Sequence, residues 1–206
     1  MVSLLIIKNI WDKIYIHPFF YFVIVISFLT GHFRNIIYFT IIIFVHELGH
    51  SITSVILGIK LNRIMLFPFG GLSVLEYSIN LSLIKELLIL IMGPIIQIIF
   101  TYLVYYLRIN VSYYFYTYSM FILLFNLIPI YPLDGGKLIN IFLSFFISFY
   151  KSFKITYYLS YFIYITLVFI VIFNFRNLIL ILILISLGIE LIKVYINRYN
   201  IYIFNY

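Results

Sequence analysis

The sequence predicts an all-α polytopic membrane protein with about six transmembrane helices and a short membrane-embedded β or re-entrant element. Of its 206 residues, 66% are apolar and 9% are charged, whereas soluble domains are about 45–50% apolar and about 25% charged. The net charge of +7 comes from only 13 Lys and Arg residues, which excludes a basic nucleic-acid-binding surface. At about 20 residues per span, we expect one domain over residues 1–206 and no added soluble domain.

The predicted spans are apolar stretches bounded by charged or turn residues. They lie at about 15–30, 35–58, 84–107, 112–130, 155–174 and 177–196. The first is expected to be retained, because no small-residue cleavage site follows it. With a cytoplasmic N-terminus, only Arg34, Arg108 and Arg176 of the 13 basic residues fall outside. The positive-inside rule therefore predicts a multi-pass protein of the cell membrane with both termini in the cytoplasm.

Two segments do not fit simple spans. Residues 61–76 are apolar but interrupted, and they predict a strand pair or re-entrant loop with Gly70 and Gly71 at its turn. Residues 126–137 contain Pro129 and Pro132, which break a helix. Non-helical backbone at membrane depth occurs where protein or a water-filled cavity satisfies it, so this segment is expected to line a site. The course of residues 138–150 stays open.

The second predicted span contains the sequence HELGH, residues 46–50. No Cys is present, so a metal would need His, Asp or Glu ligands. Residues four apart share a helix face, so His46 and His50 can bind one tetrahedral ion. Glu47 then lies beside the open metal position, where it can accept a proton from an attacking water. The motif is expected by chance roughly 0.0015 times. The alternative is a histidine pair satisfied by neighbouring backbone, but ionisable residues inside a span favour function.

Asp134 is the best candidate for a third metal ligand. His17 and His32 flank the first span, towards opposite membrane surfaces. At a rise of about 1.5 Å per residue, His46 and His50 lie roughly 16 and 22 Å into the second span, and the broken segment begins roughly 21 Å into the fourth. The two segments therefore meet at one depth, in the cytoplasmic half of the membrane. The alternative for Asp134 is a turn residue before the glycine pair that follows it.

These motifs together resemble the site-2 protease family of intramembrane zinc metalloproteases, and most closely its stage IV sporulation protein FB branch. The resemblance covers about residues 14–140. It is carried by IHP at 16–18, TGHF at 30–33, HELGH at 46–50, FPFGG at 67–71, GP at 93–94 and NLIPIYPLDGG at 126–136. It implies a catalytic core over about 14–140, followed by C-terminal helices at about 155–196.

The resemblance also implies roles for individual residues. One Zn²⁺ per chain is bound by His46, His50 and Asp134, and Glu47 is the catalytic base. Residues 61–76 form a β element that pairs with an unwound substrate. The expected substrate-binding or site-supporting residues are Asn126, Pro129, Gly70 and Gly71, with an oxyanion role for Asn126 left open.

The function expected is cleavage of a membrane-tethered protein, such as a sigma-factor precursor, in or near its membrane segment. The expected partners are that substrate, the lipid bilayer and inhibitory membrane proteins, with no nucleic acid. Gln97 departs from the Asn of many family members, and no nucleotide-sensing domain or PDZ-like insertion is expected. The alternative is a metal transporter or a catalytically silent membrane scaffold. A transporter is disfavoured because the third, fifth and sixth spans offer almost no mid-membrane acids or histidines.

Overall fold

The structure of the protein is a computed structural model that describes residues 14–16, 18–59, 61–67, 70–75, 82–174 and 178–204. The chain folds as two compact units, Met1–Leu123 and Leu124–Tyr206. The boundary falls within helix α5 (Tyr113–Asn126). Each unit is described by itself, and the single domain expected over residues 1–206 stays a prediction.

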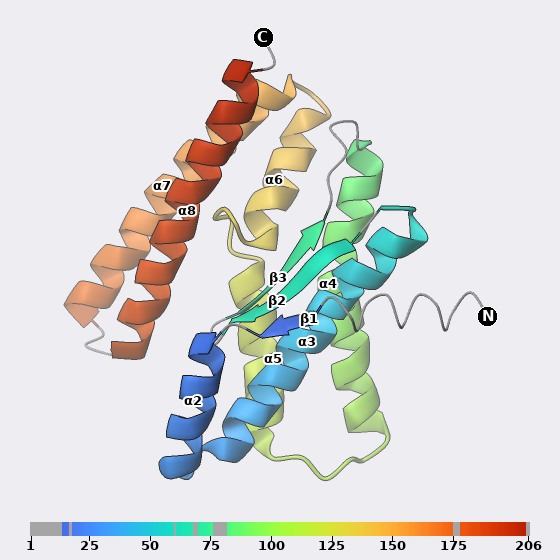
Figure 1. The fold of residues 1–206 in the computed structure, drawn as a ribbon, viewed down its shortest axis with the longest axis vertical. Helices are drawn as coiled ribbons and strands as arrows, with labels where there is room; N and C mark the ends of the chain where they lie inside the picture. Colours follow the sequence, from blue (N-terminus) through green and yellow to red (C-terminus); the bar gives the residue numbers. More distant parts are fainter. Residues whose placement is uncertain are drawn as a thin grey trace. The chain divides into compact units, whose positions relative to one another are not determined.

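The first unit is built on two long helices. These are α3 (Phe33–Ile56) and α4 (Leu83–Tyr106), which pack along each other (Figure 1). The short helix α2 (Pro18–Leu29) precedes α3, and Gly31 between them has a φ of 75°, a conformation that favours glycine. The apolar core joins α3, α4 and the part of α5 that belongs to this unit, through Ile42, Ile43, Val104, Phe115 and Ile122.

A three-stranded sheet packs against α3 in the same unit (Figure 1). Its order is β1 (Ile14–Ile16), β2 (Leu61–Phe67), β3 (Gly70–Leu75). β1 and β2 are parallel, and β2 and β3 are antiparallel. The strand pair expected over 61–76 is therefore present. The turn predicted at Gly70 and Gly71 is wrong, because both glycines pair with the preceding strand, opposite Phe67 and Leu66. The residues between the strands, Pro68 and Phe69, lie outside the described residues.

The second unit contains the end of α5, a non-helical segment over 127–133, and the helices α6 (Asp134–Ser144), α7 (Phe149–Asn174) and α8 (Leu178–Phe204). Helix α7 packs against both α6 and α8. The core cluster of this unit is formed by Tyr131, Phe153 and Leu191. Buried hydroxyl groups line α7, and one of them, Ser160 Oγ, accepts a hydrogen bond from the Tyr131 backbone N–H at 3.0 Å. The non-helical segment is thus attached to α7.

The interruption predicted over 126–137 ends earlier than expected. The chain is non-helical only over 127–133, and Asp134 begins α6, so the alternative of Asp134 as a turn residue is wrong. A Cβ at Gly135 would overlap the carbonyl oxygen of Leu127, and one at Gly136 would lie 2.5 Å from the carbonyl carbon of Ile130. The glycine pair therefore lets α6 start directly against the preceding backbone. Residues 138–144 continue this helix.

Each predicted span contains a helix, but six spans are not confirmed. Among the described residues, three helical stretches are long and apolar enough to cross a membrane: Phe33–Ile56, Leu83–Tyr106 and Phe149–Phe173. Helices α2 and α5 have 12 and 14 residues, or about 18 and 21 Å at the helical rise, less than the ~30 Å hydrocarbon core. The predicted spans 15–30 and 112–130 were therefore too long. The orientation of the termini stays a prediction.

The contact at the start of α6 generates a stability prediction. We expect Gly135→Ala to destabilise the protein by about 1–3 kcal/mol, because the new methyl group meets backbone atoms that cannot rotate away. Thermal unfolding of the detergent-solubilised protein measures this. Gly188→Ala is the matched control, because its Cβ would meet only the hydroxyl end of the Tyr164 side chain, which can move. Equal melting temperatures for the two variants would contradict the explanation.

Candidate metal centre

Helix α3 carries the motif HELGH on a buried polar stretch. His46, Glu47 and His50 are 2%, 6% and 6% exposed. The polar residues that follow are also buried, and their hydroxyl groups donate hydrogen bonds to helix carbonyl oxygens, Ser51 to Glu47 and Thr53 to Gly49, both at 2.8 Å. These hydroxyls are therefore satisfied within the helix itself.

Both imidazoles use Nδ1 for a hydrogen bond to α4. His50 Nδ1 lies 2.8 Å from the backbone carbonyl oxygen of Ile89, and His46 Nδ1 lies 2.9 Å from Oε1 of Gln97. An oxygen that only accepts requires the hydrogen to be on Nδ1. In each neutral ring, Nε2 therefore carries a lone pair, which is the form of histidine that binds a metal.

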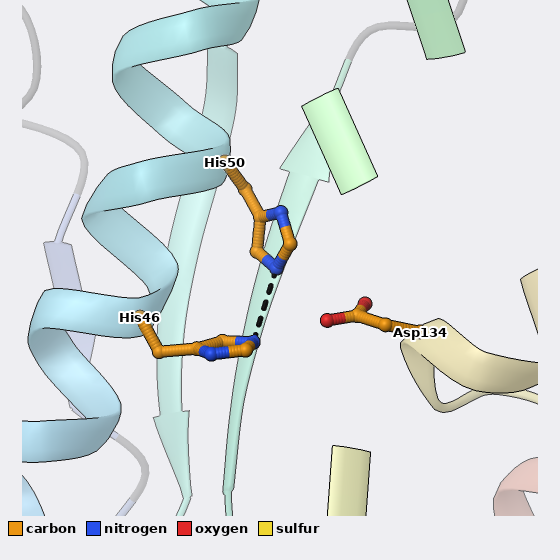
Figure 2. Close-up of side chains that lie close together, drawn as sticks. All are labelled: His46, His50 and Asp134. Carbon is orange, nitrogen blue, oxygen red and sulfur yellow. Dashed lines mark hydrogen bonds between the residues drawn. The ribbon is translucent and has the colours of Figure 1, made fainter. Parts of the chain in front are cut away.

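The two Nε2 atoms lie 3.2 Å apart, the contact drawn as a dashed line in Figure 2. With both hydrogens on Nδ1, no hydrogen is left to bridge the two neutral rings, and their lone pairs face each other. Two nitrogens each ~2.0–2.1 Å from a tetrahedral zinc ion would lie about 3.4 Å apart. The rings are close to perpendicular, with an interplanar angle of 80°. The pair therefore fits a zinc ion.

Two glycines allow α3 and α4 to approach closely at this point. A Cβ at Gly49 would lie 2.5 Å from the carbonyl oxygen of Met92, and one at Gly93 would overlap the His50 imidazole at Cε1 and Nε2. The imidazole of His50 therefore occupies the space that a side chain at residue 93 would fill. Pro94 follows inside the helix, where it removes one backbone N–H.

Asp134 is the first residue of α6, in the second unit, and Figure 2 draws its carboxylate. The residue is 6% exposed. The N-terminal end of a helix stabilises negative charge, and Lys137 Nζ lies 3.9 Å from Oδ1 of Asp134. Like His46 and His50, Asp134 is buried and offers one ligand atom suited to a metal ion.

The remaining predicted residues lie on other elements. Asn126 is the last residue of α5, Pro129 lies in the non-helical segment, and both are half-buried. Gly70 and Gly71 begin β3. Of the predicted site residues, the first unit brings His46 and His50 together, and the roles of the others stay predictions. Among the other histidines, His32 is exposed and His17 lies outside the described residues.

Sequence reasoning missed the part that α4 plays in this site. The carbonyl group of Ile89 carries no side-chain signal, and Gln97 stood out only as a departure from a family pattern. The GP pair at 93–94 entered only as one of the motifs that carry the family resemblance.

The comparisons with known proteins agree with this site. The sequence pattern of Peptidase family M50 matches residues 34–113 and 107–170, which include the histidine pair, Gln97 and Asp134. The chain belongs to Peptidase family M50. The resemblance to the site-2 proteases is therefore confirmed.

Two curated proteins and one solved structure are similar to this M50 chain. Stage IV sporulation protein FB of Bacillus subtilis is 35% identical over 138 residues, which are 64% of this chain and 48% of that protein. A zinc metalloprotease of Methanocaldococcus jannaschii is 37% identical over 108 residues, 48% of this chain and 31% of that protein. The solved structure of a site-2 protease from M. jannaschii matches with a TM-score of 0.66 and 28% identity, over 87% of this chain and 89% of that one. The chain spans less than half the length of the two curated relatives.

The contact between Gly93 and His50 predicts a metal-binding defect. We expect Gly93→Ala to lower the affinity for Zn²⁺ by about 10–100-fold, because the methyl group displaces the imidazole. Competition with a chromophoric chelator measures the affinity. Gly188→Ala, a glycine substitution in α8, is expected to bind Zn²⁺ as the wild type does. Unchanged affinity in Gly93→Ala would show that residue 93 does not constrain His50.

Proposed function

We propose that this M50 chain is an intramembrane zinc metalloendopeptidase that cleaves a membrane-tethered protein in or next to its membrane segment. The observation that carries the proposal is the His46–His50 pair, with two metal-binding nitrogens 3.2 Å apart on a helix long and apolar enough to cross a membrane. Family membership supports the reaction class. The relatives include a zinc metalloprotease and a site-2 protease, which support the metal and the setting.

The cofactor is zinc, and in our proposal Asp134 joins His46 and His50 as the third ligand. Two imidazole nitrogens and one carboxylate oxygen form a ligand set that catalytic zinc sites use, with the fourth position open. The support for Asp134 is its burial, together with its place in the first turn of α6 and in a segment matched by the family pattern. When bound, zinc supplies Lewis-acid polarisation of the peptide carbonyl group and a nucleophilic water at neutral pH.

Glu47 is the proposed general base. It follows His46 on α3 and is buried in the same polar stretch. In the proposed reaction, Glu47 takes a proton from the attacking water and then delivers it to the leaving amine nitrogen, so that one group serves both proton transfers.

A helical substrate must expose its peptide group before it is cleaved. In the described sheet, β2 lies between the other two strands, which makes β3 an edge strand. An edge strand presents backbone N–H and C=O groups that can pair with an extended substrate. We therefore assign substrate binding to β3, including Gly70 and Gly71, and support of the site to Asn126 and Pro129.

The proposed substrate class is a membrane-associated sigma-factor precursor. The similarity to stage IV sporulation protein FB, 35% identity over 138 residues, supports this choice. The proposed setting is the cell membrane with both termini in the cytoplasm, which follows from the distribution of basic residues.

The role of Glu47 predicts a loss of catalysis without a loss of metal. Glu47→Gln is expected to bind zinc normally and to cleave a membrane-tethered precursor at least about 100-fold more slowly, because the amide cannot accept the proton. Co-expression with candidate precursors and immunoblotting of the product measures cleavage. Normal cleavage by the variant would remove Glu47 from the mechanism, and zinc binding without cleavage by the wild type would identify a silent scaffold.

The role of Asp134 predicts a loss of metal. Asp134→Ala is expected to lower the affinity for zinc on the order of 100-fold, because one ligand is removed. Zinc content after dialysis against a weak chelator measures this in the full chain. Ser144→Ala, also on α6, is the control because its hydroxyl group donates only to the Asn140 carbonyl oxygen, at 2.7 Å. Full zinc retention by Asp134→Ala would refute this ligand assignment.

A further inference from the structure

Gln97 on α4 is completely buried, with 0% of its surface exposed. Its Oε1 lies 2.9 Å from Nδ1 of His46. Its Nε2 lies 2.7 Å from the backbone carbonyl oxygen of Ser119 on α5 and 3.3 Å from the hydroxyl of the same residue. All three helical stretches belong to the first unit, so the side chain joins α3, α4 and α5 within it.

The Ser119 carbonyl oxygen fixes which way the Gln97 amide faces. A backbone carbonyl can only accept a hydrogen bond, so the group beside it must be the amide nitrogen. The amide oxygen of Gln97 then faces His46. Rotating the amide by 180° would place two acceptors at 2.7 Å and would leave the carbonyl of Ser119 without this donor.

The fixed amide in turn determines the tautomer of His46. Because Oε1 of Gln97 can only accept, the imidazole hydrogen lies on Nδ1, and Nε2 keeps its lone pair. We propose that Gln97 is a positioning residue that holds His46 in the orientation and tautomer needed to bind the metal through Nε2. The inference rests on the proposed zinc function.

A closed set of hydrogen bonds holds Gln97 in place. Thr101 donates to the carbonyl oxygen of Gln97 at 2.9 Å, so in its 2.6 Å contact with the Ser119 hydroxyl the serine is the donor. The serine oxygen is then free to accept from Nε2 of Gln97. Every hydrogen of this set has an acceptor, which gives the amide one orientation before any ligand binds.

The two histidines are held by different kinds of group on the same helix. The acceptor for His50 is a backbone carbonyl, which substitution cannot remove, whereas the acceptor for His46 is a side chain. Substitutions at residue 97 therefore perturb one ligand and leave the support of the other intact.

The competing explanation is that Gln97 only ties α4 to α5. Two substitutions separate these roles. Gln97→Leu removes both the acceptor and the donor. The ionised side chain of Gln97→Glu keeps an oxygen acceptor towards His46 and offers no donor towards Ser119. If Gln97 positions His46, Gln97→Glu regains metal affinity that Gln97→Leu loses. If Gln97 only ties α4 to α5, both variants lose metal affinity.

The experiment measures the affinity for Co²⁺ and Zn²⁺ in the full chain, together with the visible absorption of bound Co²⁺. We expect Gln97→Leu to bind both ions about 10–100-fold more weakly and to shift the Co²⁺ bands, because one ligand is no longer held. Gln97→Glu is expected to recover most of this affinity. Thr40→Val on α3 is the matched control, because the Thr40 hydroxyl donates to the Ile36 carbonyl oxygen at 2.7 Å and takes no part in the hydrogen bonds of Gln97.

A measurement on the wild type covers the case in which a variant does not fold. Nitrogen-15 spectra of the zinc-loaded, histidine-labelled protein are expected to show His46 protonated at Nδ1 and metal-bound at Nε2. The opposite assignment overturns the proposal, as does equal metal affinity in the wild type and Gln97→Leu, or equal defects in the leucine and glutamate variants. A wild type that binds neither ion would instead refute the proposed zinc function.

Discussion

The site depends on two imidazole nitrogens that lie 3.2 Å apart, a distance close to that between two ligands of one tetrahedral zinc ion. The helix spacing of four residues brings the rings to one face of α3, but spacing alone leaves each ring free to rotate. The hydrogen bonds from α4 remove that freedom. The ability of the HELGH motif to bind a metal therefore depends on α4 as well as on α3.

Close helix contact is what allows α4 to contribute in this way. Gly49 and Gly93 remove side chains where the helices approach, and His50 uses the space so created. The groups on α4 that contact the pair belong to residues 89, 93 and 97, which follow one another at helical spacing, so they share one face of α4. The glycine of HELGH thus has a packing role that its position between Glu47 and His50 does not reveal.

The sequence predicted the parts of the site that depend on local spacing. The helical histidine pair follows from four-residue periodicity, and the strand pair follows from apolar segments that glycine and proline interrupt. The start of α6 was missed because Gly135 and Gly136 are typical of a turn, whereas here they permit contact with the backbone at Leu127 and Ile130. The contact from Gln97 to His46 joins residues 51 positions apart, and no local pattern encodes such a pairing.

The proposed ligand set also accounts for the charges that the chain buries. Glu47 and Asp134 are each 6% exposed, and isolated carboxylates in apolar surroundings are strongly disfavoured. Lys137 Nζ lies 3.9 Å from Oδ1 of Asp134 and offsets part of its charge. In the proposed ligand set, a bound zinc ion would offset the remaining negative charge of the two carboxylates. The burial of these two carboxylates therefore supports our proposal of an aspartate as the third ligand.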